Sequence, residues 1–214
     1  MLGKNDLRVL AGRLKGVKLQ SPRSKLTHPM GSREKLALFN MLQPYLEGSR
    51  VLDIYAGSGA LGIEALSRGA RSAFFVEKSA KIARIICQNL QQIAEKGHLE
   101  AILEALPPES RGTATNQNPA NLPENAIFYN VFTSSARDFA EDSALEGVFD
   151  VILADPPYDR FEKAEVTNLS KLLRNGGILA LSFPYAQGVP EFDDMELLTA
   201  RKYATAGIAI YRKI

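Results

Sequence analysis

Four consecutive residues capable of chemistry, Asp155-Pro156-Pro157-Tyr158, directly follow the apolar run 149–154. Such a run predicts a buried strand, and α/β enzymes place their catalytic groups where strands end in loops. The two prolines fix the backbone and have no N–H, so nearby carbonyl oxygens are left to accept hydrogen bonds from a ligand. Asp155 and the Pro156 carbonyl can each accept from an exocyclic amine, and Tyr158 can stack on the ring that carries it. The stretch predicts a site for a nucleobase amine, against the plainer alternative of an ordinary strand-ending turn.

A glycine-rich turn, Gly57-Ser58-Gly59-Ala60-Leu61-Gly62, follows an apolar strand that begins at Val51 and precedes a helix. Glycines let a ligand approach bare backbone, and the first N–H groups of a helix are unpaired. The turn lacks the Gly-Lys-Ser/Thr ending of a phosphate loop, and Asp53 would repel a pyrophosphate. Asp53 instead favours a cationic ligand, so S-adenosylmethionine is a better candidate than a nicotinamide dinucleotide. The residues expected to contact it here are Asp53, Tyr55, Ala56, Gly57, Ser58 and Gly59.

Two further segments complete the predicted cofactor site, and the residues expected to contact the cofactor there are Glu77, Lys78, Ser135 and Ala136. Glu77 ends the next apolar strand, 24 residues after Asp53, and a carboxylate at that position typically holds ribose hydroxyls. Taken alone, Glu77 would be a solvated acidic residue opening a helix from Lys78 to Ala94. After the strand 127–132, Ser135 and Ala136 are small enough to border an adenine.

The stretch from Leu52 to Ala70 resembles the signature of the bacterial 16S ribosomal RNA guanine-N2 methyltransferases, and Asp155-Pro156-Pro157-Tyr158 matches the catalytic loop of that family. Residues 8–19 are similar to its basic opening hairpin and residues 37–42 to its first helix, so the resemblance covers nearly the whole chain. It implies an α/β fold of class I, Rossmann-like, with a seven-stranded, mostly parallel sheet, helices on both faces and a small N-terminal β-hairpin. It also implies S-adenosylmethionine as methyl donor and the four loop residues as the catalytic group.

The same resemblance implies a substrate. The expected product is an N2-methylguanine in 16S ribosomal RNA, at guanine 966, formed during small-subunit assembly. The chain departs from the family pattern before the first helix, where His28 replaces an arginine, Met30 a threonine and Leu36 a glutamate. These departures leave open how this segment contacts RNA.

Positive charge is concentrated at the amino end. Residues 1–35 carry nine lysines and arginines against two acidic residues, a net +7, whereas the whole chain has a net charge of +2. Such an arm is typical of a surface that binds RNA phosphates, although a solvated tail is the plainer alternative. Interleaved glycine and apolar residues favour a hairpin over a tail. We expect RNA contacts from Arg8, Arg13, Lys15, Lys18, His28 and Arg33.

The apolar pattern predicts a basic extension over residues 1–30 and a methyltransferase domain over residues 31–214. A helix is expected from Ser32, as its cap, to Leu46, and strands are expected to begin at residues 51, 72, 127, 149 and 177. Residues 195–214 are expected to form a closing antiparallel pair. Residues 106–124, rich in Pro, Asn, Ser and Gly, predict a surface insertion.

Composition limits the other possibilities. With 45% apolar residues in 214, the chain suits one globular domain, and one cysteine with two histidines makes a disulfide or a metal cage improbable. Cys87 is expected to be a packed helix residue in a reducing compartment. No apolar run suits a membrane span, so a soluble, cytoplasmic protein is predicted.

Three alternatives to rRNA methylation stay open at this point. The Asp-Pro-Pro-Tyr chemistry also suits adenine or cytosine amines in DNA, although a target-recognition domain is not evident. A non-catalytic RNA-binding assembly factor would keep the fold without needing Asp155 and Tyr158. An NAD-dependent oxidoreductase is disfavoured by Asp53 and by the lack of a hydride-transfer acid.

Overall fold

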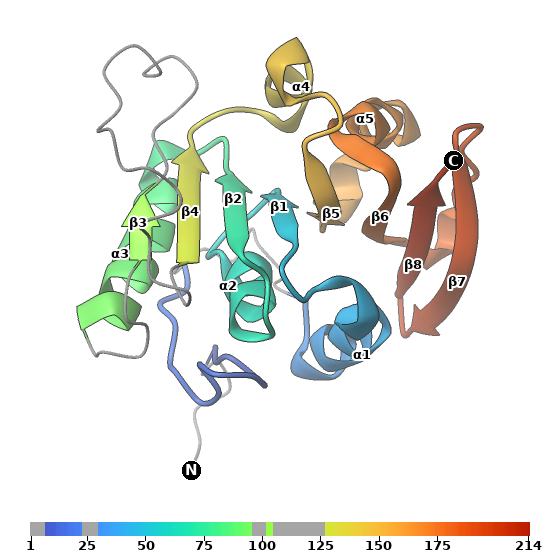
Figure 1. Cartoon of the computed structure of the whole chain (residues 1–214). Helices are drawn as coiled ribbons and strands as arrows, with labels where there is room; N and C mark the ends of the chain where they lie inside the picture. The colour runs from blue at the N-terminus through green and yellow to red at the C-terminus, as the bar shows by residue number, and fades with distance from the viewer. Residues whose placement is uncertain (1–6, 23–29, 96–101, 105–126) are drawn as a thin grey trace.

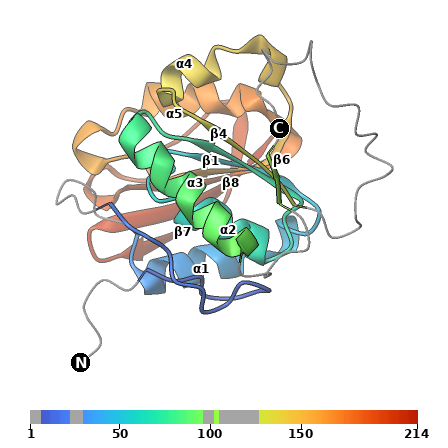
Figure 2. The same cartoon turned by 90° about the vertical axis from the view of Figure 1, so that its left-hand side faces the viewer.

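The computed structural model describes residues 7–22, 30–95, 102–104 and 127–214. His28 and the predicted insertion at 106–124 lie outside the described residues. The chain forms a central sheet with helices on both faces (Figures 1 and 2). The strands are β1 Arg50–Ile54, β2 Ser72–Val76, β3 Ile102–Glu104, β4 Ile127–Phe132, β5 Phe149–Ala154, β6 Leu173–Pro184, β7 Met195–Tyr203 and β8 Ala206–Lys213. The helices are α1 Ser32–Leu42, α2 Ala60–Ser67, α3 Ala80–Glu95, α4 Ala136–Ala140 and α5 Lys163–Leu169.

The strands lie in the order β3-β4-β2-β1-β5-β6-β8-β7. Every neighbouring pair is parallel except the two that involve β8, which runs antiparallel to both β6 and β7. The expected seven-stranded, mostly parallel sheet is therefore confirmed: it consists of the seven strands that lie from β4 to β7 in this spatial order, and the antiparallel pair of β7 and β8 closes it. The short strand β3 adds an eighth member at the edge, and three residues are too few to carry a periodic signal.

Alternate residues of each strand face different helices. Val51 and Val151 belong to the core formed with α1, α2 and α3, whereas Leu52 and Ile152 belong to the core formed with α4 and α5. Figure 2 shows these two groups of helices on opposite sides of the sheet. Because both faces are covered, the central strands are apolar throughout, as a parallel sheet requires.

The N-terminal segment, residues 7–22, turns back on itself and packs beneath α2 (Figure 1). Arg8 and Lys18 form an antiparallel bridge, and the Val9 N–H donates to the Val17 carbonyl at 3.0 Å. Val9 and Leu14 are 2% and 1% exposed and share the core of α1, α2 and α3. The basic segment is thus packed onto the sheet domain through its apolar residues.

Three local expectations differ from the structure. Gly31 is the N-cap of α1 and makes no side-chain cap, and the α-helix ends at Leu42 before a 3₁₀ turn that contains Pro44, which has no N–H to continue it. Strand β6 begins at Leu173 rather than at residue 177, because an irregularity in its pairing with β5 accommodates Gly176 at φ +71°.

Cys87 is exposed, not packed. The buried face of α3 consists of Ala83, Ile86, Asn89, Leu90 and Ile93. Cys87 lies about 100° around the helix from Ile86, outside that stripe. Among the helices in the described residues, none combines the length and apolar character needed to cross a membrane.

Candidate active site

Three carboxylates from separate parts of the chain meet at one edge of the sheet. Asp53 lies in β1, Glu77 follows β2 and Asp155 follows β5, and β1 pairs with both of the other strands. Parallel strands end at the same edge, where α/β folds bind their ligands. Burial raises the pKa of Asp53 well above its usual range, a hydrogen bond from Gly62 opposes this, and the charges of Asp155 and Glu77 raise it further. The structure therefore brings two of these predicted site residues, Asp155 and Glu77, within electrostatic reach of the third, Asp53.

The glycine-rich turn between β1 and α2 has the backbone that its residues predict. Gly57 and Gly59 have φ of +54° and +77°, and the Gly62 N–H donates to Asp53 Oδ2 at 2.8 Å. A Cβ on Gly62 would lie 2.3 Å from the Phe75 ring, so this glycine allows close packing of helix and sheet. A Cβ on Gly57 would meet only the Tyr55 carbonyl, at 4.0 Å. The backbone at Gly57 is therefore open to a ligand.

The Glu77 carboxylate is held in a fixed orientation. Its Oε2 accepts from the Gly57 N–H at 3.1 Å, and its Oε1 accepts from the Ser79 N–H at 2.9 Å. Glu77 is 9% exposed, and α3 begins three residues later at Ala80, so it is not a solvated residue opening that helix. Each oxygen keeps further capacity to accept, which suits a pair of ribose hydroxyls. Lys78 beside it is exposed.

Ser135 and Ala136 follow β4, but their side chains are already engaged. The Ser135 hydroxyl accepts from the Asp138 N–H and caps α4, and Ala136 is 5% exposed in the core beneath that helix. Any contact of this pair with a ligand would therefore be made mainly through backbone.

The Asp-Pro-Pro-Tyr loop leaves the end of β5 with Asp155 partly buried and Pro156 buried. Burial raises the pKa of Asp155 to about 6, and a hydrogen bond from Ser182 opposes the rise. Asp155 is thus mostly ionised at neutral pH. Tyr158 begins a 3₁₀ turn, and its hydroxyl lies 2.6 Å from Ser182 Oγ.

The structure adds a residue that the sequence did not single out, Asn89 on α3. Its Oδ1 accepts from the Gln20 N–H at 2.7 Å, and its Nδ2 donates to the carbonyls of Gln20 at 3.1 Å and Ser58 at 3.0 Å. One fully buried amide thus joins the N-terminal segment to the glycine-rich turn. An amide within the apolar stripe of α3 is the signal that could have identified it.

Glu64 on α2 holds the other end of the N-terminal segment. Its buried carboxylate accepts from the N–H groups of Leu10 at 2.7 Å and Ala11 at 3.0 Å. It also pairs with Arg68 at 2.8 Å and Lys35 at 3.6 Å. Lys35, one of the nine cations of residues 1–35, is 2% exposed and therefore does not contribute to an external RNA surface.

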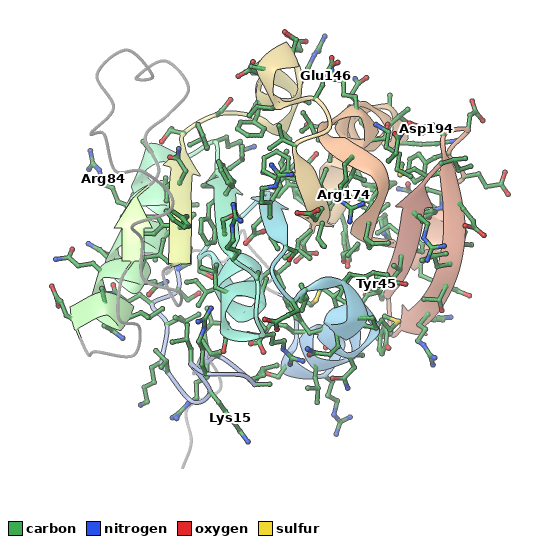
Figure 3. All side chains as sticks on the ribbon, in the orientation of Figure 1. Lys15, Tyr45, Arg84, Glu146, Arg174 and Asp194 are labelled. Carbon is green, nitrogen blue, oxygen red and sulfur yellow. The ribbon has the colours of Figure 1, made fainter. Side chains whose placement is uncertain are left out.

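The other predicted RNA contacts are placed differently from one another. Lys15, Lys18 and Arg33 are exposed, and Figure 3 shows Lys15 extending away from the N-terminal segment. Arg8 is half-buried. Arg13 donates from Nε and Nη2 to the Leu66 carbonyl, at 3.2 and 3.1 Å, and so ties the segment to the end of α2.

The Rossmann-like sheet, the glycine-rich turn with its carboxylates and the Asp-Pro-Pro-Tyr loop together define a class I methyltransferase. Residues 7–119, just over half of the chain, match the model of the family described as Conserved hypothetical protein 95, and the chain belongs to this family. It is 31% identical to "Ribosomal RNA small subunit methyltransferase D" of Haemophilus influenzae over 98% of this chain and 93% of that one.

Two other similarities agree with this family. The chain is 29% identical to "Putative rRNA methyltransferase YlbH" of Bacillus subtilis, over 97% of this chain and 99% of the relative. The solved structure of "Putative methyltransferase yhhF" from Escherichia coli has a TM-score of 0.72 at 22% identity, covering 98% of both chains. The second similarity supports the fold.

Proposed function

We propose that this protein transfers a methyl group from S-adenosylmethionine to the exocyclic N2 amine of a guanine in 16S ribosomal RNA during small-subunit assembly. The observation that carries the proposal is the convergence of Asp53 and Glu77 with Asp155, the first residue of the Asp-Pro-Pro-Tyr loop. The relative from Haemophilus influenzae, named for methylation of small-subunit ribosomal RNA, supports the choice of RNA.

The residues at this edge fit S-adenosylmethionine. Burial raises the pKa of Asp53, and the charges of Asp155 and Glu77 raise it further, so a cationic ligand here would stabilise the ionised carboxylate. Asp53 would face the methionine ammonium, Gly57 would offer open backbone, and Glu77 would hold the ribose. When bound, this cofactor supplies a methyl group on a positively charged sulfur.

The loop residues have the chemistry to present a guanine amine. Asp155 and the Pro156 carbonyl would accept its two N–H groups and aim the nitrogen lone pair at the methyl carbon. As the N–C bond forms and the C–S bond breaks, positive charge develops on nitrogen, and the ionised Asp155 stabilises it. With a pKa of about 6, set mainly by burial, Asp155 can then take the proton, or solvent can remove it.

The substrate must expose its base, because the amine of a stacked guanine is out of reach. Tyr158 is partly exposed and would stack on the unstacked base, a contact worth roughly 1–3 kcal/mol. The exposed cations of the N-terminal segment would hold neighbouring phosphates. That segment is joined to the glycine-rich turn through Asn89, so the proposed RNA and cofactor sites would be neighbours.

The direct test is methyl transfer from labelled S-adenosylmethionine to small-subunit RNA and to partly assembled particles from a strain that lacks the protein. Nucleoside mass spectrometry should find N2-methylguanine, and mapping should place it at one position, expected to be guanine 966. Label on DNA amines instead would favour a DNA methyltransferase. Absence of transfer to any nucleic acid, with cofactor binding intact, would favour an assembly factor and overturn the proposal.

A further inference from the structure

Ser182 is a buried hydroxyl in an otherwise apolar part of β6. It is 3% exposed, and its neighbours Leu181 and Phe183 are completely buried. Leu181 is paired with Ala154 at the end of β5, so Ser182 lies at the level of Asp155 on the next strand. A lone serine here needs partners, because an unpaired buried hydroxyl is costly.

Its partners are two residues of the Asp-Pro-Pro-Tyr loop. Ser182 Oγ lies 2.6 Å from the Tyr158 hydroxyl, and Ser182 lies at the level of Asp155 on the neighbouring strand, where a hydrogen bond from Ser182 lowers the pKa of that carboxyl. An ionised carboxylate can only accept, so the Ser182 hydroxyl can donate to Asp155 while it accepts from Tyr158. This arrangement suits a chain of hydrogen bonds that runs from Tyr158 through Ser182 to Asp155.

We propose that Ser182 is a positioning residue that fixes Asp155 and Tyr158 relative to each other, so that one base can stack and present its amine at the same time. Its catalytic consequence rests on the proposed function, whereas the hydrogen-bond chain does not. The backbone of Asp155 is constrained on both sides, because β5 precedes it and two prolines follow it. Ser182 then adds a constraint on its side chain. Misplacement by about 1 Å can cost about a hundredfold in rate.

The charge of Asp155 is the second quantity that Ser182 controls. Its hydrogen bond lowers the pKa of Asp155 against the larger effect of burial. The other ionisable groups nearby are Asp53 on β1 and Tyr158. The charge of Asp155 raises the pKa of both, and the charge of Glu34 on α1 also raises the pKa of Tyr158. Removing the hydroxyl leaves these groups in place, so its effect on Asp155 can be isolated.

Three variants of Ser182 separate the hydroxyl from the space it fills. Ser182→Ala removes it, Ser182→Cys keeps the size with a weak donor, and Ser182→Thr keeps the hydroxyl. Ser49→Ala is the matched control, because Ser49 is 4% exposed, donates to the Leu46 carbonyl at 2.7 Å and lies before β1, at the opposite edge of the sheet. If Ser182→Ala does not fold, the Cys and Thr variants carry the comparison.

The first measurement is the pKa of Asp155 in the protein without RNA, from carbon-13 carboxyl resonances assigned with Asp155→Asn. We expect a higher pKa in Ser182→Ala and Ser182→Cys, and a value close to the native one in Ser182→Thr and Ser49→Ala. An unchanged pKa in Ser182→Ala and Ser182→Cys would overturn the hydrogen-bond chain. This titration decides the matter even if the protein methylates no RNA.

The second measurement is methyl transfer. Loss of the Ser182 hydroxyl is expected to lower kcat by tenfold or more, to move the acid limb of the pH profile upward, and to change the Kd for S-adenosylmethionine less than about twofold. Ser182→Thr should recover much of kcat. If Ser182→Ala keeps the native kcat and loses only thermal stability, as Ser49→Ala is expected to do, then Ser182 has a structural role only. Failure of the native protein in the same assay would instead reject the proposed function.

Discussion

Asp155 is the residue whose charge state governs the candidate site. It lies partly buried, accepts from Ser182 and is coupled to the buried Asp53. Burial raises its pKa to about 6, close enough to neutrality for a group that must be ionised to accept and can later hold a proton. The same burial makes the charged form less favourable in the folded protein than in the unfolded chain.

The pH dependence of turnover follows from this pKa. As pH falls through about 6, Asp155 becomes protonated. It can then neither stabilise the positive charge that develops on the amine nitrogen nor take the proton. We expect kcat/KM to decrease about tenfold per pH unit on the acid side. The limb for kcat should lie lower, because a bound sulfonium favours the carboxylate. Initial rates at constant ionic strength between pH 5 and 8 measure both limbs, and a flat profile would contradict this assignment.

Asp155→Asn should trade activity for stability. The amide keeps the shape and can still accept from Ser182, but it removes the charge, so kcat should fall by about 10²–10⁴-fold with cofactor affinity nearly unchanged. Because burial raises the folded pKa to about 6, above the value of an aspartate in the unfolded chain, the carboxylate destabilises the fold at pH values above that unfolded-state pKa. The variant should gain roughly 2 kcal/mol, or about 4–8 °C in Tm, at pH 7 but not at pH 4. Equal Tm differences at both pH values would disprove the linkage.

At the scale of elements, two helices dock the N-terminal segment onto the sheet domain. Glu64 of α2 binds the backbone of Leu10 and Ala11, and Asn89 of α3 binds the backbone of Gln20. Neither of these contacts lies in the glycine-rich turn, but Asn89 also donates a hydrogen bond to the Ser58 carbonyl within that turn. The segment expected to contact RNA is therefore linked by hydrogen bonds to the glycine-rich turn proposed to bind the cofactor.

Glu64→Gln should be strongly destabilising. The substitution leaves the buried Lys35 and Arg68 without their shared counter-charge, which typically costs about 3–5 kcal/mol. Glu141→Gln is the matched control, because its ion pair with Arg137 is on the surface, with side chains 77% and 67% exposed. Urea unfolding monitored by circular dichroism gives both values. Similar losses in the two variants would show that the buried pairs contribute no more than surface ones.

Asn89→Ala should weaken cofactor and RNA binding together. It removes the hydrogen bonds to Gln20 and Ser58, each worth about 1 kcal/mol, so the Kd for S-adenosylmethionine should rise several-fold. Gln92→Ala provides the comparison, since the half-buried Gln92 on the same helix donates to the Lys18 carbonyl rather than to the glycine-rich turn. Calorimetric titration of both ligands distinguishes the variants. Loss of RNA affinity alone in Asn89→Ala would show that the two sites are independent.

At the scale of the whole molecule, the uneven charge sets how the protein meets a polyanion. The net +7 of residues 1–35 lies on a protein with a net charge of only +2, so the remainder is acidic. Part of that positive charge is internal, because Lys35 is buried against Glu64. Among the described residues of this stretch, the exposed cations are Arg13, Lys15, Lys18 and Arg33.

Replacing Lys15 and Lys18 by alanine should weaken RNA binding in a salt-dependent way. Each lost phosphate contact lowers the slope of log K against log salt by about 1. Lys163→Ala is the control, since Lys163 is exposed on α5, across the sheet. Filter binding of a small-subunit RNA fragment between about 50 and 200 mM salt measures the slopes. Identical slopes for the double variant and the control would remove the N-terminal segment from the RNA interface.

The sequence by itself determined those features that are encoded within a short stretch of chain. The strand, glycine turn and helix around Asp53, the strand that ends at Glu77 and the stiff loop after residue 154 each carry their own apolar period and turn residues. The seven-stranded sheet followed from those units and from the family resemblance. A three-residue strand, an exposed cysteine and an irregularity in β6 left no comparable local signal.

Only the tertiary structure decided which side chains from distant stretches meet. Glu64 reaches backbone more than fifty residues away, Asn89 reaches Gln20 across 69, and Ser182 reaches Tyr158 across 24. Nothing in the local pattern around a buried serine, asparagine or glutamate names its partner, because that partner is set by strand order and helix packing. The physical reason is that chemistry-bearing residue types are chosen locally, whereas burial and hydrogen bonding are satisfied across the fold.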